Sequence, residues 1–224
     1  MCVSEMVSAI LLWFLAQNGS AWWECGKPYT PEQAEARAQV YAQVVYDSAQ
    51  RHPAPDAEEW LLAMLMQESA LDRCQIAGWA KRKLKMKRRP TEKKAIEVLE
   101  KTSNGFRVDA GPMQRIYPPY GMRRYQEKRA LDLKYQVELT AAKLPQYYKT
   151  CTGNYGASRK WKVKWSRKRL TCSDLYFTLH NTGGMSVNTK YHRSVSFQRY
   201  RWQKEKKKQA LRLLQSPGLT ARIP

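Results

Sequence analysis

The strongest hydrophobic pattern in the chain spans residues 60–69 and ends near a carboxylate, Glu68. Its hydrophobic positions recur at helical spacing and share one face with Glu68: Trp60, Leu61, Met64 and Leu65. This pattern predicts a helix with Glu68 on its buried side, near the last turn. Burial raises the pKa of a carboxyl group, so Glu68 is a candidate proton donor near neutral pH. Taken alone, the pattern also fits an ordinary, half-exposed and ion-paired glutamate at a helix end.

The residues on either side of the Glu68 helix predict its bounds. Asp56 stands before the helix with Glu59 three residues later, a variant of the capping box. The helix is predicted to end at residues 70–73.

Several other stretches have helical periodicity. Residues 31–50 form an alanine-rich helical pattern whose apolar positions include Val40, Tyr41, Val44, Val45 and Tyr46. Further helices are predicted at 91–101, 131–148 (with Leu131, Tyr135, Leu139 and Ala142 on one stripe), 174–181 and 187–214.

Strand and turn signals are fewer. Residues 160–165 alternate Lys with apolar residues, which predicts a strand or a small β-hairpin. Adjacent Gly and Pro predict turns at 111–114 and 118–121. We therefore expect one mostly α (α+β) domain over residues 22–215, with basic insertions near 75–106 and 151–172. A flexible tail is expected at 216–224.

The composition sets limits on the partners. The chain has 224 residues, with 40 Lys and Arg against 19 Asp and Glu, a net charge of +21. This charge favours an anionic partner such as nucleic acid, a membrane or a charged cell wall. Three basic stretches carry much of the charge, at 81–94, 159–169 and 199–212. Lys alternating with Trp also suits nucleic acid or lipid headgroups, but an exported protein rarely meets nucleic acid, so no nucleic acid is expected.

The N-terminus predicts export. Residues 7–16 are an uncharged run of ten, too short to span a bilayer comfortably, and small residues follow up to Ala21. This arrangement predicts a signal peptide at 1–21 and no transmembrane anchor after its cleavage. The segment before the run has no Lys or Arg and contains Glu5. The alternative interpretation is a hydrophobic helix that belongs to the core.

The cysteines indicate an oxidising compartment. There are five and no CxxC, and only three histidines could assist them, so neither a metal nor another cofactor is expected. If Cys2 leaves with the signal peptide, four remain, which suits two disulfides in a periplasmic or secreted protein. Three pairings are open. We favour Cys151–Cys172, which closes a basic loop, and Cys25–Cys74 for the remaining two.

Four short motifs occur in a fixed order along residues 31–202: Glu-Ser-Ala-Leu-Asp at 68–72, Gly-Pro-Met-Gln at 111–114, Leu-His-Asn-Thr-Gly at 179–183 and Tyr-His-Arg-Ser-Val at 191–195. Together they resemble the signature of soluble lytic transglycosylases, which are lysozyme-like and related to goose-type lysozymes. That family shows Glu-Ser, Gly-Leu-Met-Gln, Ala-Tyr-Asn before Gly, and Tyr-Val-x-x-Val. The chain departs from it at Pro112, at Leu179–His180 and in the long segment between Ser69 and Met113.

The resemblance implies a lysozyme-like fold and cleavage of the MurNAc–GlcNAc β-1,4 bond of peptidoglycan, with formation of 1,6-anhydroMurNAc. On this resemblance Glu68 would act in turn as acid and base, so no second carboxylate would be needed. Tyr191 would orient Glu68, and Asn181, Met113 and Gln114 would hold the sugar near the scissile bond. Ser69 would steady the end of the helix or equally be a plain helix-end hydroxyl. His180 would belong to the wall of the cleft.

The residues themselves leave alternatives open. Most glycosidases use two carboxylates, and the second candidates here are Asp72 and Asp109. Asp72 more plausibly orients the loop after the helix, whereas Asp109 either lines the cleft or stabilises the turn that follows it. A hydrolytic muramidase on the same fold is one alternative function. Another is a non-catalytic protein whose basic segments bind anionic cell-wall polymers, and a nucleic-acid binder is a weaker one.

Overall fold

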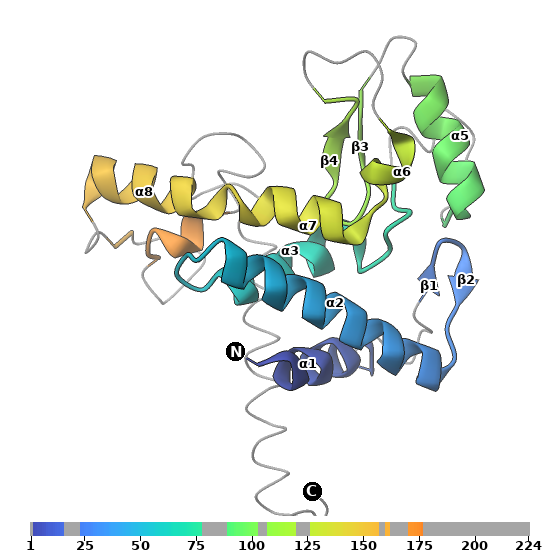
Figure 1. The fold of residues 1–224 in the computed structure, drawn as a ribbon, viewed down its shortest axis with the longest axis horizontal. Helices are drawn as coiled ribbons and strands as arrows, with labels where there is room; N and C mark the ends of the chain where they lie inside the picture. The colour runs from blue at the N-terminus through green and yellow to red at the C-terminus, as the bar shows by residue number, and fades with distance from the viewer. Residues whose placement is uncertain are drawn as a thin grey trace, which may run out of the picture.

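A computed structural model describes residues 2–15, 23–77, 89–102, 107–119, 126–156, 160–161 and 170–176 of the chain. Within these residues the protein is mostly helical, with two antiparallel sheets of two strands each (Figure 1). The mostly α (α+β) class is therefore confirmed. The order is α1 (Val3–Leu15), β1 (Trp23–Glu24), β2 (Lys27–Pro28), α2 (Pro31–Arg51), α3 (Ala57–Ser69), α5 (Glu92–Thr102), β3 (Val108–Ala110), β4 (Arg115–Tyr117), α6 (Glu127–Ala130), α7 (Leu133–Ala141), α8 (Leu144–Tyr155) and the short 3-10 helix η1 (Ser173–Leu175).

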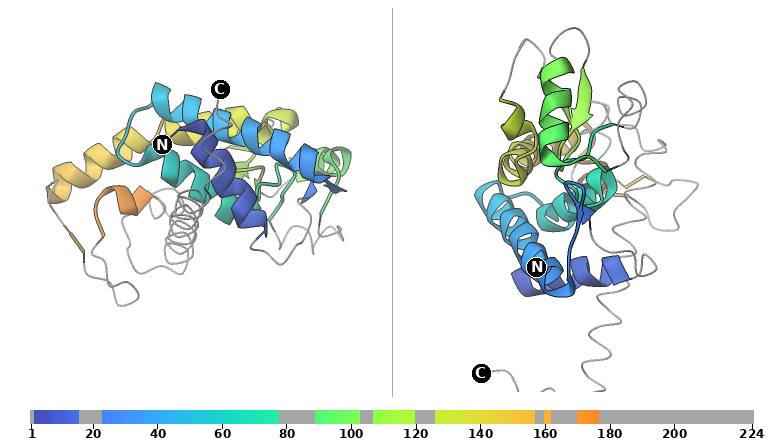
Figure 2. Two further views of the ribbon diagram at one scale, coloured as in Figure 1. Left: turned by 90° about the horizontal axis from the view of Figure 1, so that it is seen from below. Right: turned by 90° about the vertical axis from the view of Figure 1, so that its right-hand side faces the viewer.

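Helix α3 is the centre of the larger hydrophobic core. Every residue from 60 to 66 is buried, so α3 is enclosed on all sides and not on one face alone. It packs against α2 and α7, which cross it in Figure 1 and Figure 2. The predicted end is confirmed, because Ala70 terminates α3 in the left-handed conformation. The predicted capping box is wrong: Asp56 makes no side-chain cap and instead accepts a hydrogen bond from Ser173 Oγ at 2.8 Å.

Helix α2 begins at a capping box. Thr30 Oγ1 accepts from the backbone of Gln33 at 3.3 Å, and the Gln33 side chain accepts from the backbone of Thr30 at 3.0 Å. Its buried residues are Ala38, Tyr41, Ala42, Val45, Ser48 and Ala49. Tyr41 and Val45 lie in the core as the pattern predicts, but Val40 is 44% exposed.

Helix α1 packs against α2 and buries Met6, Ala9 and Ile10 in the same core. This packing is the one that the alternative interpretation of the N-terminal segment expects. Residues 16–22 lie outside the described segments. Cleavage near Ala21 therefore stays a prediction.

The single helix predicted over 131–148 is wrong in two respects. The chain forms α7 and α8, separated at residues 142–143, because Pro145 in the first turn of α8 has no N–H to bond the carbonyl of Ala141. The buried face also differs from the predicted stripe. Leu139 is 37% exposed and Ala142 is exposed. The core-facing residues are Leu133, Gln136, Val137, Thr140 and Ala141.

A second hydrophobic cluster lies over α5, α6 and the β3–β4 hairpin. The hairpin pairs Val108 with Tyr117 and Ala110 with Arg115, and Ile76 bridges to Ala110 on the other edge. The pattern predicts only a turn at 111–114, and the flanking strands are too short to show alternation. The helix predicted at 91–101 is confirmed as α5.

Both favoured disulfide pairings are confirmed: Cys25 bonds Cys74, and Cys151 bonds Cys172. The second disulfide joins α8 to the η1 segment in a small cluster with Leu175. Nearby, Trp161 forms an antiparallel bridge with Leu170. Residues 162–169 of the predicted hairpin, the predicted helix at 187–214 and the tail at 216–224 lie outside the described segments.

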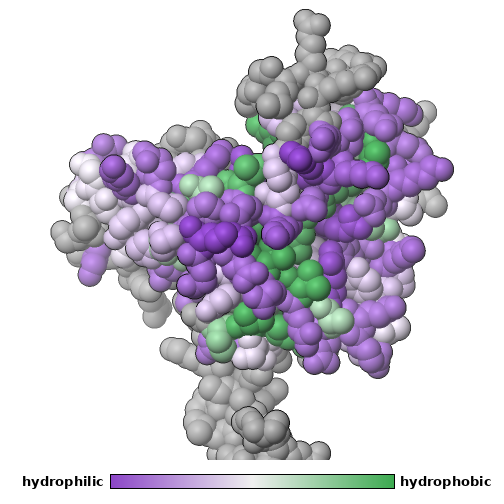
Figure 3. Space-filling model, in the orientation of Figure 1, coloured by the Kyte–Doolittle hydropathy of each residue, from purple (hydrophilic) through white to green (hydrophobic). Residues whose placement is uncertain are grey.

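The described segments differ in charge from the rest of the chain. They contain 18 of the 19 Asp and Glu but only 16 of the 40 Lys and Arg, so the excess of cations lies in the remaining residues. Figure 3 shows a central band of hydrophobic residues on one face, flanked by hydrophilic ones. Among the helices described here, none combines the length and the apolar character that a membrane span requires.

Candidate functional site

Glu68 lies in the last turn of α3, where the chain leaves the larger core for the second one. The next residue, Ser69, is buried, and its hydroxyl donates to the Leu65 carbonyl at 3.0 Å. Ala70 and Leu71 then both adopt positive φ, 52° and 61°, which turns the chain sharply. Ser69 thus steadies the helix end, and its hydroxyl is occupied by the helix itself.

The Glu68 carboxyl is half-buried and has no hydrogen-bond or ion-pair partner among the described residues. Burial, with a smaller contribution from the charge of Asp109, raises its pKa to about 8. A carboxyl group in these surroundings holds its proton at neutral pH, which is the property required of a general acid. The raised pKa that the sequence predicts for Glu68 is present in the structure.

Asp109, on the hairpin, lies close enough to Glu68 for its charge to raise the Glu68 pKa. It is the central residue of β3, half-exposed between the buried Val108 and Ala110, because alternate strand residues point to opposite faces. Its backbone carbonyl accepts from Ala77 at 2.8 Å, which ties the strand to the chain that follows α3. Burial raises the pKa of Asp109 as well. Asp109 therefore lines the site, and its side chain stabilises no turn within the described part of the chain.

The Gly111–Gln114 turn closes the hairpin beside Glu68's loop. The Gln114 side-chain amide donates to the carbonyls of Gln75 and Gly111, each at 2.9 Å, and the Gly111 N–H donates to the Gln75 carbonyl at 2.9 Å. Gly111 has φ +82°, and a Cβ there would lie 1.9 Å from the Ala130 carbonyl oxygen. Only glycine fits this position. The turn is thus fixed to the loop that leaves α3.

Met113 supports the turn from the core side. Its side chain is fully buried, and its N–H donates to Gln136 Oε1 at 3.1 Å. Neither group is therefore directed at a ligand. Of the two residues expected to touch sugar here, Gln114 is the one that remains partly exposed, although its amide N–H groups already bond backbone carbonyls.

Gln136 is a site residue that the sequence reasoning missed. It is buried on α7, and its amide donates to the carbonyls of Ala110 and Ala130, at 3.1 and 2.5 Å. With its bond to Met113, it fastens both ends of the turn to α6 and α7. The available signal was a glutamine on the apolar face of a predicted helix, beside Leu133 and Val137. Buried amides of this kind normally have full sets of partners.

Asp72 fixes the loop after Glu68. One carboxylate oxygen accepts from the N–H groups of Cys25 and Cys74, both at 3.0 Å. The orienting role expected for Asp72 agrees with this geometry. The ligand atoms of Cys25, Asp72 and Cys74 lie within 4.8 Å of one another, but the two sulfurs are bonded together.

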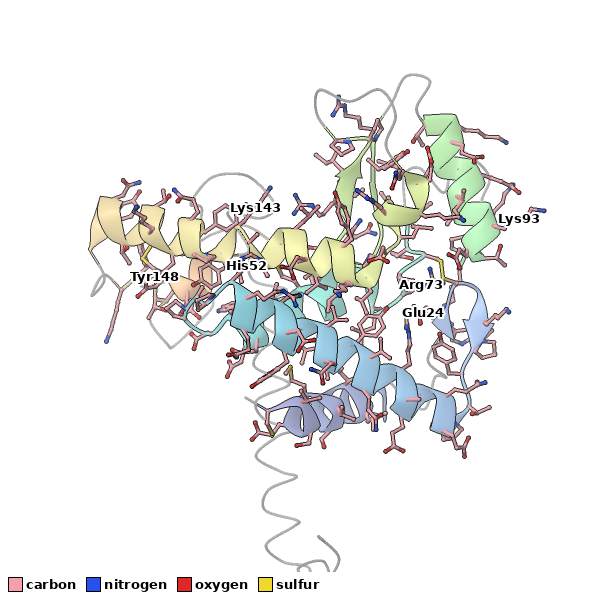
Figure 4. All side chains as sticks on the ribbon, viewed as in Figure 1. Glu24, His52, Arg73, Lys93, Lys143 and Tyr148 are labelled. Atoms are coloured by element: carbon pink, nitrogen blue, oxygen red, sulfur yellow. A yellow bond between two sulfur atoms is a disulfide. The ribbon has the colours of Figure 1, made fainter. Side chains whose placement is uncertain are left out.

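A buried ion cluster lies next to this loop. Glu24 bonds Arg37 at 2.5 Å and Arg73 at 3.2 Å, and it accepts the Tyr29 hydroxyl at 2.6 Å. Arg73 also pairs with Glu92 at 2.6 Å. Figure 4 shows Glu24 and Arg73 together where the β1–β2 hairpin meets the loop after α3. The cluster thus joins this hairpin, α2, α5 and the loop.

Three predicted site residues, His180, Asn181 and Tyr191, lie outside the described segments. Asp109 lies close enough to Glu68 for its charge to raise the Glu68 pKa, and Gln114 lies on the turn that follows Asp109. Ser69, Asp72, Met113 and Gln136 fix the backbone on either side. Comparison of the chain with protein-family models, with curated proteins and with solved structures finds no match. The resemblance to lytic transglycosylases therefore rests on the four motifs.

Proposed function

We propose that the protein is a lysozyme-like lytic transglycosylase that cleaves the MurNAc–GlcNAc β-1,4 bond of peptidoglycan. The observation that carries the proposal is the Glu68 carboxyl. It is half-buried, has no partner among the described residues, and has a pKa raised to about 8. Structural carboxylates are normally paired, so such a group beside a fixed turn favours a catalytic role.

The reaction follows from one carboxyl group. Protonated Glu68 gives its proton to the glycosidic oxygen, and the C1–O bond breaks with the bonding electrons leaving on that oxygen. The substrate's N-acetyl group supports the oxocarbenium-like carbon. Ionised Glu68 then takes the proton of the MurNAc 6-hydroxyl, whose oxygen bonds C1 to close the 1,6-anhydro ring. Glu68 ends the cycle protonated, as it began.

Asp109 favours a second candidate function on the same site, hydrolysis by a muramidase. Its charge raises the pKa of Glu68, so the two carboxyls lie near enough to interact. In a hydrolase, ionised Asp109 would stabilise the sugar cation or direct a water to it. The product then carries a reducing MurNAc end and no anhydro ring.

The disulfides agree with a periplasmic or secreted setting, because such bonds persist in oxidising compartments. The basic stretches at 81–94, 159–169 and 199–212 are proposed to bind anionic cell-envelope polymers. Such binding would hold the enzyme beside the glycan strands. It would weaken as salt is added.

Mass spectrometry of purified peptidoglycan, digested with the wild type and with Glu68→Gln, tests the proposal. We expect 1,6-anhydromuropeptides from the wild type and none from the variant. Reducing MurNAc ends in place of anhydro products would support the hydrolase. If neither product forms and wall binding is equal in both proteins, the chain is a non-catalytic binding protein.

A further inference from the structure

The turn that follows Glu68 is held in an unfavourable conformation. Ala70 and Leu71 are consecutive residues with side chains, and both have positive φ. Each such residue costs roughly 1 kcal/mol or more and persists only where its surroundings enforce it. The direction of the Glu68 side chain depends on this turn, because the turn fixes the last residues of α3.

Three contacts enforce the turn. The Tyr41 hydroxyl donates to the Leu71 carbonyl at 2.8 Å, and the Asp72 N–H donates to the Ser69 carbonyl at 3.1 Å. The Asp72 carboxylate then accepts from the N–H groups of Cys25 and Cys74. The first contact comes from α2. The last reaches a segment 47 residues away in sequence, at Cys25.

The Cys25–Cys74 disulfide connects these same two N–H donors covalently. Cys25 is itself anchored, because the preceding residue, Glu24, is bonded to Arg37 of α2. Two residues beyond Cys74, Ile76 bridges to Ala110, the neighbour of Asp109 on β3. Along the chain, Cys74 thus lies between the turn that follows Glu68 and the residue that bridges to β3.

We propose that Asp72 and the Cys25–Cys74 disulfide form a clamp that positions the Glu68 carboxyl opposite Asp109, so that activity requires the oxidised disulfide. This inference rests on the proposed function. A dithiol reductant would break the S–S bond, both sulfurs would become thiols, and the reductant would become a disulfide. Asp72 is a positioning residue, since it acts through the turn.

The chain contains a matched control. The Cys151–Cys172 disulfide joins α8 to the η1 segment and belongs to a separate small cluster. We expect its removal to destabilise the protein but to leave the Glu68 turn intact. The test compares C25S/C74S with C151S/C172S, each confirmed as folded by circular dichroism at the assay temperature. Two further variants, Asp72→Ala and Asp72→Asn, keep both disulfides.

Two readouts are measured for each protein: kcat/KM on peptidoglycan, and the pH titration of the Glu68 carboxyl carbon by NMR, assigned through Glu68→Gln. We expect C25S/C74S and Asp72→Ala to lose about tenfold or more in kcat/KM, since a misplacement near 1 Å costs that much. The Glu68 titration should move down from about 8 toward an ordinary carboxyl value. Asp72→Asn, which keeps an acceptor oxygen, should lose less, and C151S/C172S should match the wild type.

The inference is overturned if folded C25S/C74S and Asp72→Ala keep the wild-type titration and kcat/KM. It is also overturned if C151S/C172S changes both readouts as much as C25S/C74S does. A wild type that cleaves no glycan refutes the proposed function alone. The NMR titration still decides whether the clamp positions Glu68.

Discussion

Two carboxyl groups in this protein, the buried Glu24 and the half-buried Glu68, have opposite surroundings. Glu24 is 3% exposed, yet Arg37 and Arg73 supply cations and Tyr29 donates a hydroxyl. Glu68 is more exposed, yet among the described residues no cation or donor bonds it, and the charged group that acts on it is another carboxyl, Asp109. Depth of burial therefore does not distinguish the structural carboxylate from the one proposed to be catalytic.

The two carboxyl groups differ in whether hydrogen bonds and countercharges offset the cost of burying them. A carboxylate buried for stability has hydrogen bonds and countercharges, because the cost of desolvation is otherwise not offset. Glu24 meets this condition and joins four segments of the fold. Glu68 does not meet it, so its position lowers stability as pH rises from 4.5 to 8, and the group keeps its proton at neutral pH. Each prediction below challenges one side of this contrast.

The largest effect is expected for Glu68→Gln. The variant cannot donate a proton, so glycan cleavage should fall by roughly 10³–10⁴-fold, the upper range for a general acid. Product formation by liquid chromatography at pH 6 measures the loss. Circular dichroism should be unchanged. A variant that retains more than a tenth of wild-type activity would assign the chemistry to another group.

Glu24→Gln should lower stability and leave activity nearly unchanged. It leaves Arg37 and Arg73 without their buried anion, so the free energy of unfolding should fall by about 3 kcal/mol. Urea denaturation measures this loss. Activity per folded molecule should change little at low temperature.

The matched control for Glu24 is Glu138→Gln. Glu138 also bonds two basic side chains, Arg51 and His52, and its hydrogen bonds, that of Arg51 above all, lower its pKa to about 2. These partners are partly exposed to solvent. The control should therefore cost about 1 kcal/mol or less. Equal losses of unfolding free energy in Glu24→Gln and Glu138→Gln would contradict the idea that buried ion pairs matter more than exposed ones.

Gly111→Ala tests the turn that faces Glu68. A Cβ would lie 1.9 Å from the Ala130 carbonyl oxygen, in a residue at φ +82°. We expect a loss of about 2–3 kcal/mol in unfolding free energy, with the turn displaced in the molecules that remain folded. The same substitution at Gly153, where the added methyl meets nothing, should be neutral or slightly stabilising. Urea titrations of the pair give the difference.

Sequence reasoning succeeded where one local pattern was decisive. The span 60–69 was long and apolar enough to give α3 and its end, and few enough cysteines remained for the pairing of all four to be favoured correctly. It failed where distant residues decide the outcome. Asp56 is spaced as a helix cap but bonds Ser173, a partner 117 residues away. The break between α7 and α8 was readable from Pro145, and was missed.

The site shows the same division. The raised pKa of Glu68 could be predicted, because its helical register placed it among apolar residues. The role of Gln136 could not, because it depends on carbonyls of Ala110 and Ala130 that only folding brings to α7. The face of the strand on which Asp109 lies could not be predicted either. The two strands have three residues each, too few to show an alternating pattern, so this face is known only from the folded hairpin.

The cost of an uncompensated carboxyl should appear in the pH dependence of stability. The pKa of Glu68 is about 8 in the folded protein and near 4.5 in the unfolded chain, so the folded state holds the extra proton between these values. The stabilisation that this extra proton gives the folded state is therefore complete below pH 4.5 and is lost as pH rises to 8. After allowance for its partial exposure, Glu68→Gln should be more stable than the wild type by about 2 kcal/mol at pH 9. At pH 4 the two should agree, as urea titrations will show.

The smallest shift, and the most discriminating, is expected for Asp109→Asn. Burial is the main cause of the raised Glu68 pKa and the Asp109 charge the lesser one, so the variant should lower that pKa by about 1 unit or less. The basic limb of the pH–rate profile should move down equally. A transglycosylase needs only Glu68, so its rate at pH 6 should change by a few-fold at most. A hydrolase that depends on Asp109 should lose about 10²-fold or more across the whole profile. The height of the profile, and not its position, therefore separates the two reactions.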